Sequence, residues 1–248
     1  MNTQTHASAT RIDEITDGIF RISTPVPATV VPGGFTFNQY LIRDDDPLLF
    51  HTGPRMLFGV VREAIERVLP AVSLRYISFS HVEADECGSL NQFLAAAPQA
   101  VPLCGHIAAM VSITDLADRA PRALADQERL TLGQHTVQWI DAPHLPHGWE
   151  CGFLTETTTR TLLCGDLFTQ FGELHPAITE NDILEPSEAA RIGMDYYAHS
   201  PDTSRLLGRL ADTAPITLAC MHGPAWRGDG AALLRGLGSR LASAPTQH

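Results

Sequence analysis

The spacing of hydrophobic and polar positions predicts a chain in which strands and helices alternate. Short apolar runs bounded by turn residues predict strands, and apolar residues that recur three or four positions apart predict helices. Strands are expected at residues 11–16, 19–23, 35–42, 47–51, 75–80, 100–104, 136–141, 152–156, 161–164 and 216–220. Helices are expected at residues 56–69, 88–97, 107–115, 187–198, 202–213 and 229–242.

These elements fall into two blocks that resemble each other weakly. The run Leu48–Gly53 is similar to Leu162–Asp166, and Ile77–His81 is similar to Leu218–His222. Two similar halves indicate two sheets that pack face to face, with helices outside. No Gly/Ser-rich or Pro-rich linker separates the blocks. We therefore expect one α/β (α+β) domain over residues 1–248, ending in a flexible tail at 243–248.

Composition restricts the class of protein. Hydrophobic residues make up 44% and charged residues 18% of the 248 residues, which is typical of a soluble globular domain. The formal net charge is −11 and no cluster of basic residues stands out, so we expect neither nucleic acid nor an anionic membrane as a partner. Residues 1–15 lack the features of a signal peptide, and no apolar run approaches the roughly 20 residues that span a bilayer.

The cysteine pattern agrees with a cytoplasmic location. The five cysteines form no CxxC pair, and their number is odd. We expect free thiols in a reducing cytoplasm rather than a disulfide framework. The missing CxxC pair also argues against a fused rubredoxin-type iron centre.

Four possible metal ligands follow the strand expected at 75–80. They are His81, Glu83, Asp85 and Glu86. Alternation along an extended loop would place the first three on a common side. Charged and basic groups gathered at a strand end are costly unless a cation binds them. The segment therefore predicts a metal site.

Three further strands run into polar residues of the same kind. His147 comes after the strand at 136–141, Asp166 directly after 161–164 and His222 after 216–220. Strand ends that converge on one edge of a sheet are the usual place for a binding site. The sequence thus predicts a six-ligand dinuclear metal site formed by His81, Glu83, Asp85, His147, Asp166 and His222.

The order of these residues resembles that of the metallo-β-lactamase superfamily, which usually carries HxHxDH. Glu83 stands at the second His position of this motif. A Glu at this position resembles the diiron branch of the superfamily, which comprises the flavodiiron proteins and the stand-alone oxygen-binding diiron proteins. The resemblance extends to Asn38–Ile42 and Leu48–Gly53 and so covers nearly the whole chain. It implies an αββα sandwich of two mixed sheets flanked by helices.

The resemblance also implies a role for each ligand. One iron would be held by His81, Glu83 and His147, the other by Asp85 and His222, and Asp166 would bridge them. A carboxylate in place of an imidazole makes the site harder and more anionic, which favours iron over the alternative of two zinc ions. Two metals about 3.5–4 Å apart leave open positions where O2 or another small diatomic such as NO can bind.

Three residues depart from the family pattern or adjoin it. Glu86 stands where His is usual, and it is a further ligand, a hydrogen-bond acceptor behind the ligands, or a surface residue. His51 stands where Asp is usual, and we expect it near the site, orienting a ligand, or in the core as a satisfied histidine. His144 precedes His147 by three residues and is a weaker candidate ligand.

The function expected from this resemblance is that of a non-haem diiron protein that binds or reduces O2 or NO. The sequence shows no flavodoxin-like phosphate cradle, so we expect no flavin in this chain and an electron donor on a separate protein. A zinc-dependent hydrolase of an ester, lactone or phosphodiester is the alternative, and a non-catalytic O2 or redox sensor is a second one. A homodimer is compatible with all three.

Overall fold

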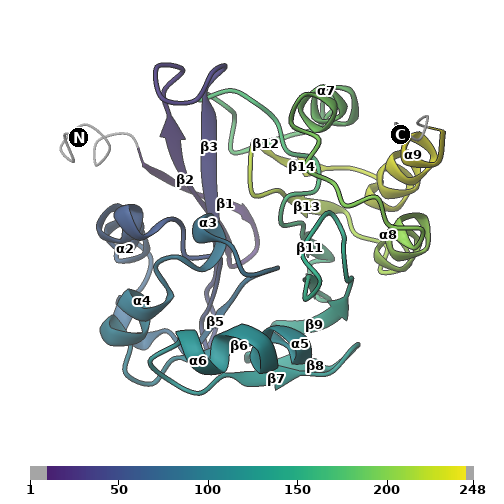
Figure 1. Ribbon diagram of the computed structural model, residues 1–248. Coiled ribbons are helices and arrows are strands. Elements are labelled where there is room, and N and C mark those ends of the chain that lie inside the picture. The colour runs from purple at the N-terminus through teal and green to yellow at the C-terminus, as the bar shows by residue number, and fades with distance from the viewer. Residues whose placement is uncertain (1–9, 244–248) are drawn as a thin grey trace.

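Two mixed sheets form the centre of the fold in this computed structural model, which describes residues 10–243 (Figure 1). Sheet A contains, in spatial order, β1 (Arg11–Thr16), β2 (Ile19–Val26), β3 (Phe35–Ile42), β4 (Leu48–Phe50), β5 (Tyr76–Ser78), β6 (Val101–Gly105) and β7 (Arg122–Leu124). Sheet B contains, in spatial order, β12 (Ile178–Thr179), β14 (Ala225–Arg227), β13 (Thr217–Ala219), β11 (Thr161–Leu163), β10 (Gly152–Glu156), β9 (Thr136–Asp141) and β8 (Arg129–Thr131).

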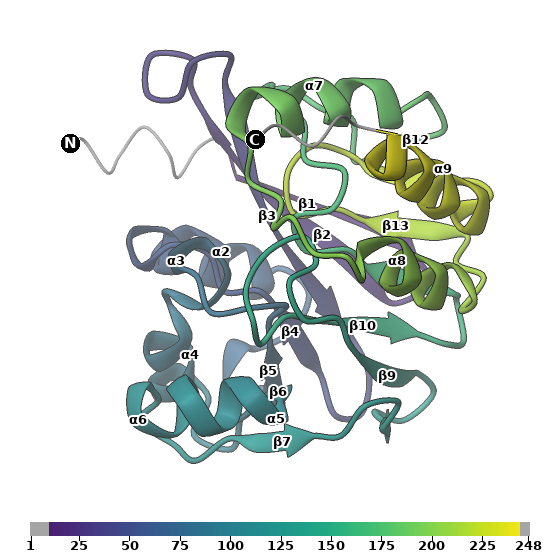
Figure 2. The same ribbon diagram turned by 45° about the vertical axis from the view of Figure 1, so that its right-hand side comes forward.

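The helices lie on the outer sides of this pair of sheets. The N-terminal half contributes the 3-10 turns η1 (Arg55–Leu57) and η2 (Ala71–Ser73), α2 (Phe58–Ile65), α3 (Ala84–Cys87), α4 (Leu90–Ala96), α5 (His106–Ala108), the π-helical turn η3 (Ala109–Ile113) and α6 (Thr114–Leu116). The C-terminal half contributes α7 (Leu184–Met194), α8 (Thr203–Ala211) and α9 (Gly230–Ser243). Figures 1 and 2 show each group beside its own half, so the layers follow the order helix, sheet, sheet, helix.

Alternating side chains on the strands divide the apolar core into three layers. In β3, Tyr40 points between the two sheets and Leu41 points toward α2 and α4. In β10, Leu154 points between the sheets and Phe153 points toward α8 and α9. Successive residues of a strand face opposite sides, so these central strands are buried on both faces. The predicted αββα sandwich is confirmed.

Some predicted boundaries were wrong. The helix expected at 56–69 is an α-helix only over 58–65, because the chain tightens into turns before Pro70. Sequence analysis also missed β7, β8, β12 and β14. Each has only two or three residues, and most of these are not fully buried, so they give no apolar run to detect. Of the tail predicted at 243–248, residues 244–248 lie outside the described part of the chain.

The five cysteines, all within the described residues, are free. Between residues 10 and 243, none of the helices has both the length and the apolar character needed to cross a bilayer.

Candidate metal centre

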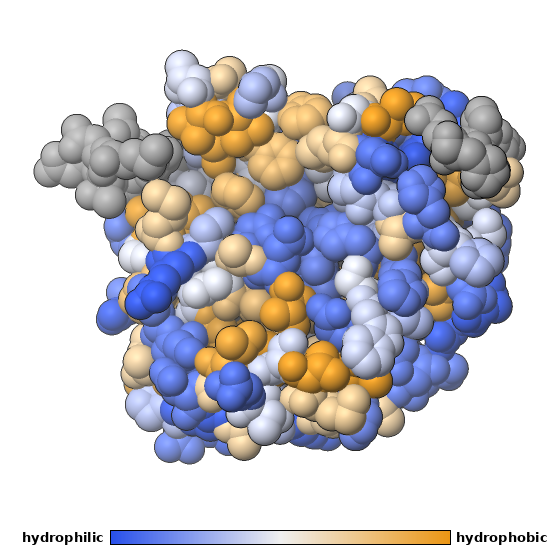
Figure 3. Space-filling model, in the orientation of Figure 1, coloured by the Kyte–Doolittle hydropathy of each residue, from blue (hydrophilic) through white to orange (hydrophobic). Residues whose placement is uncertain are grey.

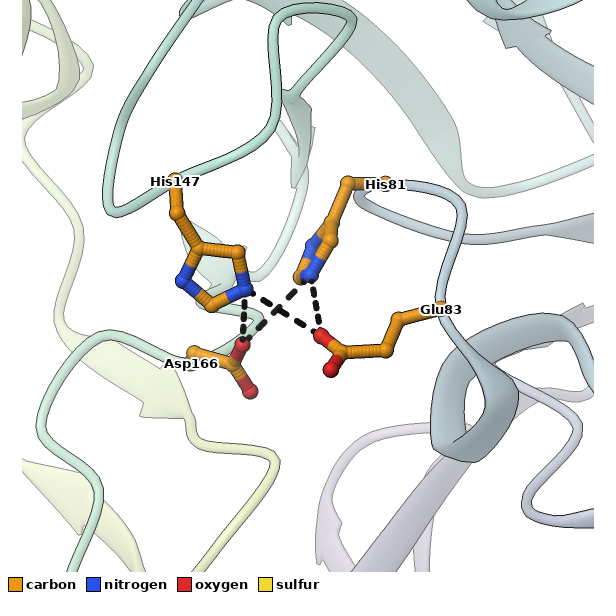
Figure 4. Close-up of side chains that lie close together, drawn as sticks. All are labelled: His81, Glu83, His147 and Asp166. Carbon is orange, nitrogen blue, oxygen red and sulfur yellow. Dashed lines mark hydrogen bonds and ion pairs between the residues drawn. The ribbon is translucent and has the colours of Figure 1, made fainter. Parts of the chain in front are cut away.

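Side chains that follow four different strands meet at one edge of the two sheets. His81 and Glu83 follow β5, His147 follows β9, Asp166 follows β11 and His222 follows β13. In Figure 4, the ring nitrogens of His81 and His147 point toward the carboxylates of Glu83 and Asp166. One possible ligand atom from each of these four residues lies within 4.8 Å of all the others. The expected convergence of strand ends is therefore present.

Glu83 and Asp166 face the same two imidazole rings. Glu83 Oε2 lies 2.8 Å from His81 Nε2 and 3.1 Å from His147 Nε2. Asp166 Oδ2 lies 3.6 Å from His81 Nε2 and 3.5 Å from His147 Nε2. Two nitrogens and two oxygens thus surround one point, as the donor set of a single cation would.

The second oxygen of Asp166 faces a different pair of residues. His222 Nε2 lies 3.1 Å from Asp166 Oδ1 and 3.5 Å from Asp85 Oδ2. Asp166 Oδ1 is buried and accepts no hydrogen bond from any described residue. A buried carboxylate oxygen without a donor is costly. The two oxygens of Asp166 therefore suit a carboxylate that touches two cations, and the donor chemistry fits a dinuclear site.

Asp85 does not lie in an extended loop, as the sequence had predicted. Glu83 is extended, with φ −140° and ψ 159°, but α3 begins at the next residue and Asp85 belongs to its single turn. This turn directs the Asp85 carboxylate toward His222 instead of placing it in line with His81. Burial raises the pKa of Asp85 to about 6, an effect opposed by His222 and reinforced by Asp166.

The outer nitrogens of two histidines are held by backbone carbonyls. His147 Nδ1 lies 2.9 Å from the carbonyl oxygen of Tyr196, and His222 Nδ1 lies 2.8 Å from that of Thr36. A carbonyl can only accept, so each Nδ1 carries the proton and donates. In the neutral form of each ring, Nε2 then carries the lone pair that a metal ligand requires.

Glu86 supports the third histidine from behind. Its carboxylate is fully buried and accepts hydrogen bonds from the backbone N–H of Ser80 at 3.0 Å, that of His81 at 2.8 Å and the Ser80 hydroxyl. Glu86 Oε1 also lies 3.2 Å from His81 Nδ1. Burial alone would raise the pKa of Glu86, but His51 and His81 hold it well below its usual value. These contacts favour the acceptor role among the three alternatives.

The other two candidates occupy different surroundings. His51 is buried, and its Nε2 lies 3.4 Å from Glu86 Oε2, so it contacts the group that supports His81. Its backbone has a φ of 64°, in the left-handed region. His144 is exposed, and within residues 10–243 its side chain makes no hydrogen bond or ion pair with the six predicted ligands. The structure thus brings His51 close to the centre and leaves His144 outside it.

The centre is most exposed to solvent at Glu83 and His147. The Glu83 side chain is 50% exposed and that of His147 is 28% exposed, whereas those of His81 and Asp166 are 3% and 9% exposed. Hydrogen bonds from His147 and His81 hold the pKa of Glu83 far below its usual value. Figure 3 shows hydrophilic side chains near the middle of this face, between the two halves. A small molecule would reach the centre from the side of Glu83 and His147.

Sequence analysis missed the residues that hold the His222 turn. The Asn38 side-chain amide donates to the carbonyl oxygens of Cys220 at 2.9 Å and Gly223 at 2.8 Å, and the Tyr40 hydroxyl donates to Cys220 at 2.7 Å. Both residues belong to the run Asn38–Ile42 that resembles the family, which was the available signal. Thr36 and Tyr196 orient His222 and His147 through their backbone carbonyls. Every residue has such a carbonyl, so the sequence gives no signal for this role.

Comparison with known proteins identifies the family. Residues 35–207 match the family model described as ODP family beta lactamase. The chain belongs to this family. The part matched by the ODP family model includes every predicted ligand except His222. The match confirms the predicted resemblance to the diiron branch of the metallo-β-lactamase superfamily.

Curated relatives and solved structures agree with membership of the ODP family. The chain is 26% identical to the rubredoxin-oxygen oxidoreductase of Megalodesulfovibrio gigas over 81% of its own length and 51% of that protein. It is 25% identical to the nitric oxide reductase of Moorella thermoacetica over 87% of its length and 57% of that protein. The chain therefore spans little more than half of these relatives. The solved structure of rubredoxin oxygen:oxidoreductase from Desulfovibrio gigas superposes with a TM-score of 0.79 at 19% identity, covering 95% of this chain and 63% of the other.

Proposed function

We propose that this ODP-family protein binds two iron ions and reduces O2 or NO with electrons from a separate donor. The main supporting observation is the Glu83 carboxylate between the imidazoles of His81 and His147, at 2.8 and 3.1 Å. A carboxylate at this point gives the centre more negative charge than a third imidazole would, and this favours iron over zinc. The rubredoxin-oxygen oxidoreductase and the nitric oxide reductase are relatives consistent with this chemistry.

In this proposal, His81, Glu83 and His147 would hold one iron, Asp85 and His222 would hold the other, and Asp166 would serve both. Two bound irons would supply a redox-active pair with open positions for a diatomic molecule. The assignment follows the two faces of Asp166, whose Oδ2 points toward His81 and His147 and whose Oδ1 points toward His222.

The protein's own groups hold the ligands in place and keep water away from one side. The carbonyls of Tyr196 and Thr36 and the carboxylate of Glu86 fix the three imidazole rings in orientation. The Phe35 ring stacks on His222 with 4.2 Å between ring centroids, so it shields that side of the centre from solvent. Reactants and protons would therefore arrive past the half-exposed Glu83.

Metal analysis combined with gas consumption tests the proposal. Protein produced without metal supplementation should contain iron, close to two ions per chain. The reduced protein should consume O2 or NO for as long as an external reductant is supplied. Two zinc ions per chain together with turnover of activated esters would overturn the proposal in favour of a hydrolase. O2 binding without turnover, whichever donor is supplied, would overturn it in favour of a sensor.

The substitution Glu83→His tests the observation on which the proposal rests. It replaces the oxygen between the two imidazoles by a third nitrogen, so the metal content should shift from iron toward zinc. The matched control is Glu63→His, which changes an exposed carboxylate on α2 and should leave the metal content unaltered. An unchanged ratio of iron to zinc in Glu83→His would show that this carboxylate does not select the metal.

A further inference from the structure

A groove of about 510 Å³ lies on the outer face of sheet B, and none of the predicted metal ligands lines it. Its floor is formed by β8, β9 and β10, and its walls by the turn before β11 and the C-terminal end of α8. A volume of this size falls within the range of about 300–1,000 Å³ found for small-molecule sites. The groove is therefore large enough for a small metabolite.

The floor of the groove is a polar row that crosses three strands. Arg129 in β8 pairs with Gln138 in β9, and Gln138 pairs with Thr155 in β10. Residues directly opposite each other on neighbouring strands point to the same face of a sheet. Ile140, two residues after Gln138, packs in the core beneath α8. The polar row thus lies on the part of the outer face of sheet B next to the part that α8 covers.

Two arginines that line this groove lack, among the described residues, the hydrogen-bond partners that most arginines of the chain have. All 17 basic residues are arginines, and each lies between positions 11 and 240, within the described residues. Almost all of their side chains bind a carboxylate or a backbone carbonyl. The side chains of Arg55, Arg129 and Arg160 make no hydrogen bond or ion pair with any described residue. Two of these three arginines, Arg129 and Arg160, line the groove.

Asp212, which lines the groove, and Asp126, which lies beside it, are each paired with another arginine. Arg209 binds both carboxylate oxygens of Asp126, at 2.8 and 2.7 Å, and Asp212 accepts a hydrogen bond of 3.0 Å from Arg235. The charges of Arg129 and Arg160 are therefore left without a counter-ion. On a chain with a formal net charge of −11, this groove is a local positive site.

We infer that this groove binds a small anion with two or more negative charges, a phosphoester or a polycarboxylate, through Arg129 and Arg160. A guanidinium group is planar and matches two oxygens of a phosphate or carboxylate at once. Two like charges beside one groove repel each other, and a bound anion removes that repulsion. The Gln138 amide and the Thr155 hydroxyl offer hydrogen bonds to the rest of the ligand.

Calorimetric titration of the metal-loaded protein at low salt tests the inference. Adenosine monophosphate serves as the phosphoester probe and succinate as the dicarboxylate probe. We expect saturable binding of at least one probe, weakened by added salt. Tighter binding of adenosine monophosphate assigns the ligand to the phosphoesters, and tighter binding of succinate assigns it to the polycarboxylates. Absence of saturable binding for both probes overturns the inference.

Variants locate the site. Arg129→Gln and Arg160→Gln should each weaken binding about tenfold, because each removes a charged hydrogen-bond donor. The matched control is Arg55→Gln, which removes the third unpaired arginine away from the groove and should leave the affinity unchanged. All three side chains are exposed, so the variants should keep the circular dichroism spectrum of the parent protein. Unchanged affinity in the double variant Arg129→Gln/Arg160→Gln would place the anion elsewhere and overturn the inference.

Discussion

Asp166 is the side chain on which both parts of the proposed centre depend. Its Oδ2 faces His81 and His147, and its Oδ1 faces His222. His147 faces only the group of ligands that includes His81 and Glu83. Removing Asp166 would therefore deprive each metal of an oxygen ligand, whereas removing His147 would deprive one metal of a nitrogen ligand.

Asp166→Ala and His147→Ala are expected to differ in metal content. Asp166→Ala should lose most of both irons, and His147→Ala should keep about one iron per chain, held by Asp85, Asp166 and His222. Elemental analysis of the purified variants measures the difference, and thermal unfolding verifies that each variant is folded. Two irons retained in Asp166→Ala would mean that Asp166 does not bridge.

Residues whose own side chains face the proposed metals could be predicted from the sequence, whereas the roles of supporting residues could not. The six predicted ligands stood out because polar residues at the ends of apolar strands are conspicuous in a sequence. Glu86 was ambiguous, because its role depends on accepting the backbone N–H groups of Ser80 and His81, which only the folded loop brings within 3.0 Å. The same limit applies to Asp85, whose direction is set by the helical turn α3.

Close packing between strands is visible at Gly152 in β10. A Cβ atom at this position would collide with the buried Trp139 indole of β9. The backbone N–H of Gly152 donates to the carbonyl of Ser80 at 2.9 Å, which ties sheet B to the loop that carries His81. A side chain at this position would therefore disturb both the core and the centre.

Gly152→Ala should lower the free energy of unfolding by about 1–3 kcal/mol, the usual cost of overpacking. Gly59→Ala is the control. A Cβ on Gly59 in α2 meets no other atom within 4 Å, and alanine should stabilise that helix by about 1 kcal/mol. Chemical denaturation measures both values. Equal stability of Gly152→Ala and the parent protein would show that the indole moves aside freely.

An ion pair joins three turns that lie far apart in the sequence. The Asp44 carboxylate accepts hydrogen bonds from the backbone N–H groups of Asp45, Gln134 and His135 and lies 2.8 Å from His135 Nδ1. His135 Nε2 lies 3.1 Å from the carbonyl oxygen of Asp17 in the first hairpin turn. Both ring nitrogens therefore face acceptors, which favours the protonated ring.

The pH dependence of stability should reveal this pair. Burial alone would raise the pKa of Asp44, but its hydrogen bonds lower it to about 2 from 3.8, so its contribution is complete above pH 3.8 and is lost as the pH falls toward 2. Burial would lower the pKa of His135, but Asp44 and Asp17 raise it above 6.5, so its contribution is complete below pH 6.5 and is lost at higher pH.

Asp44→Asn should therefore destabilise the protein most between about pH 4 and 6.5. The measurement is the unfolding midpoint in denaturant for both proteins across pH 2 to 9. Asp45→Asn, a change at the exposed neighbouring carboxylate, is the control and should show no such window. A destabilisation by Asp44→Asn that stays constant across the whole range would contradict the proposed titration.

At the level of elements, sequence analysis predicted the interior of the fold better than its edges. The central strands β3, β10 and β11 are buried on both faces and carry several large apolar residues, and they were located to within a residue or two. The edge strands β7, β8 and β12 are short and partly exposed, so their pairing depends on the neighbouring strand rather than on their own sequence.

The proposed centre lies between the two halves of the molecule. His81, Glu83 and Asp85 follow β5 of sheet A, whereas His147, Asp166 and His222 follow strands of sheet B. Bound metal would therefore connect the two sheets. A ligand that binds only the folded state stabilises that state, by about 4 kcal/mol when its concentration is a thousand times its dissociation constant.

Loading with iron should accordingly raise the unfolding temperature, and removal of iron by a chelator should lower it again. Differential scanning calorimetry under anaerobic conditions measures this shift. The shift should be smaller in His147→Ala and nearly absent in Asp166→Ala. Iron that changes the unfolding temperature of Asp166→Ala as much as that of the parent protein would indicate binding outside this centre.

The division of the proposed ligands between two halves would also order the steps by which the protein acquires iron. A nascent chain that has folded only its first half presents His81, Glu83 and Asp85, and the histidines of the second half are still missing. Such an intermediate offers one imidazole and two carboxylates, too few groups to retain iron firmly. Iron acquisition would therefore be a late event, which follows the docking of sheet B on sheet A.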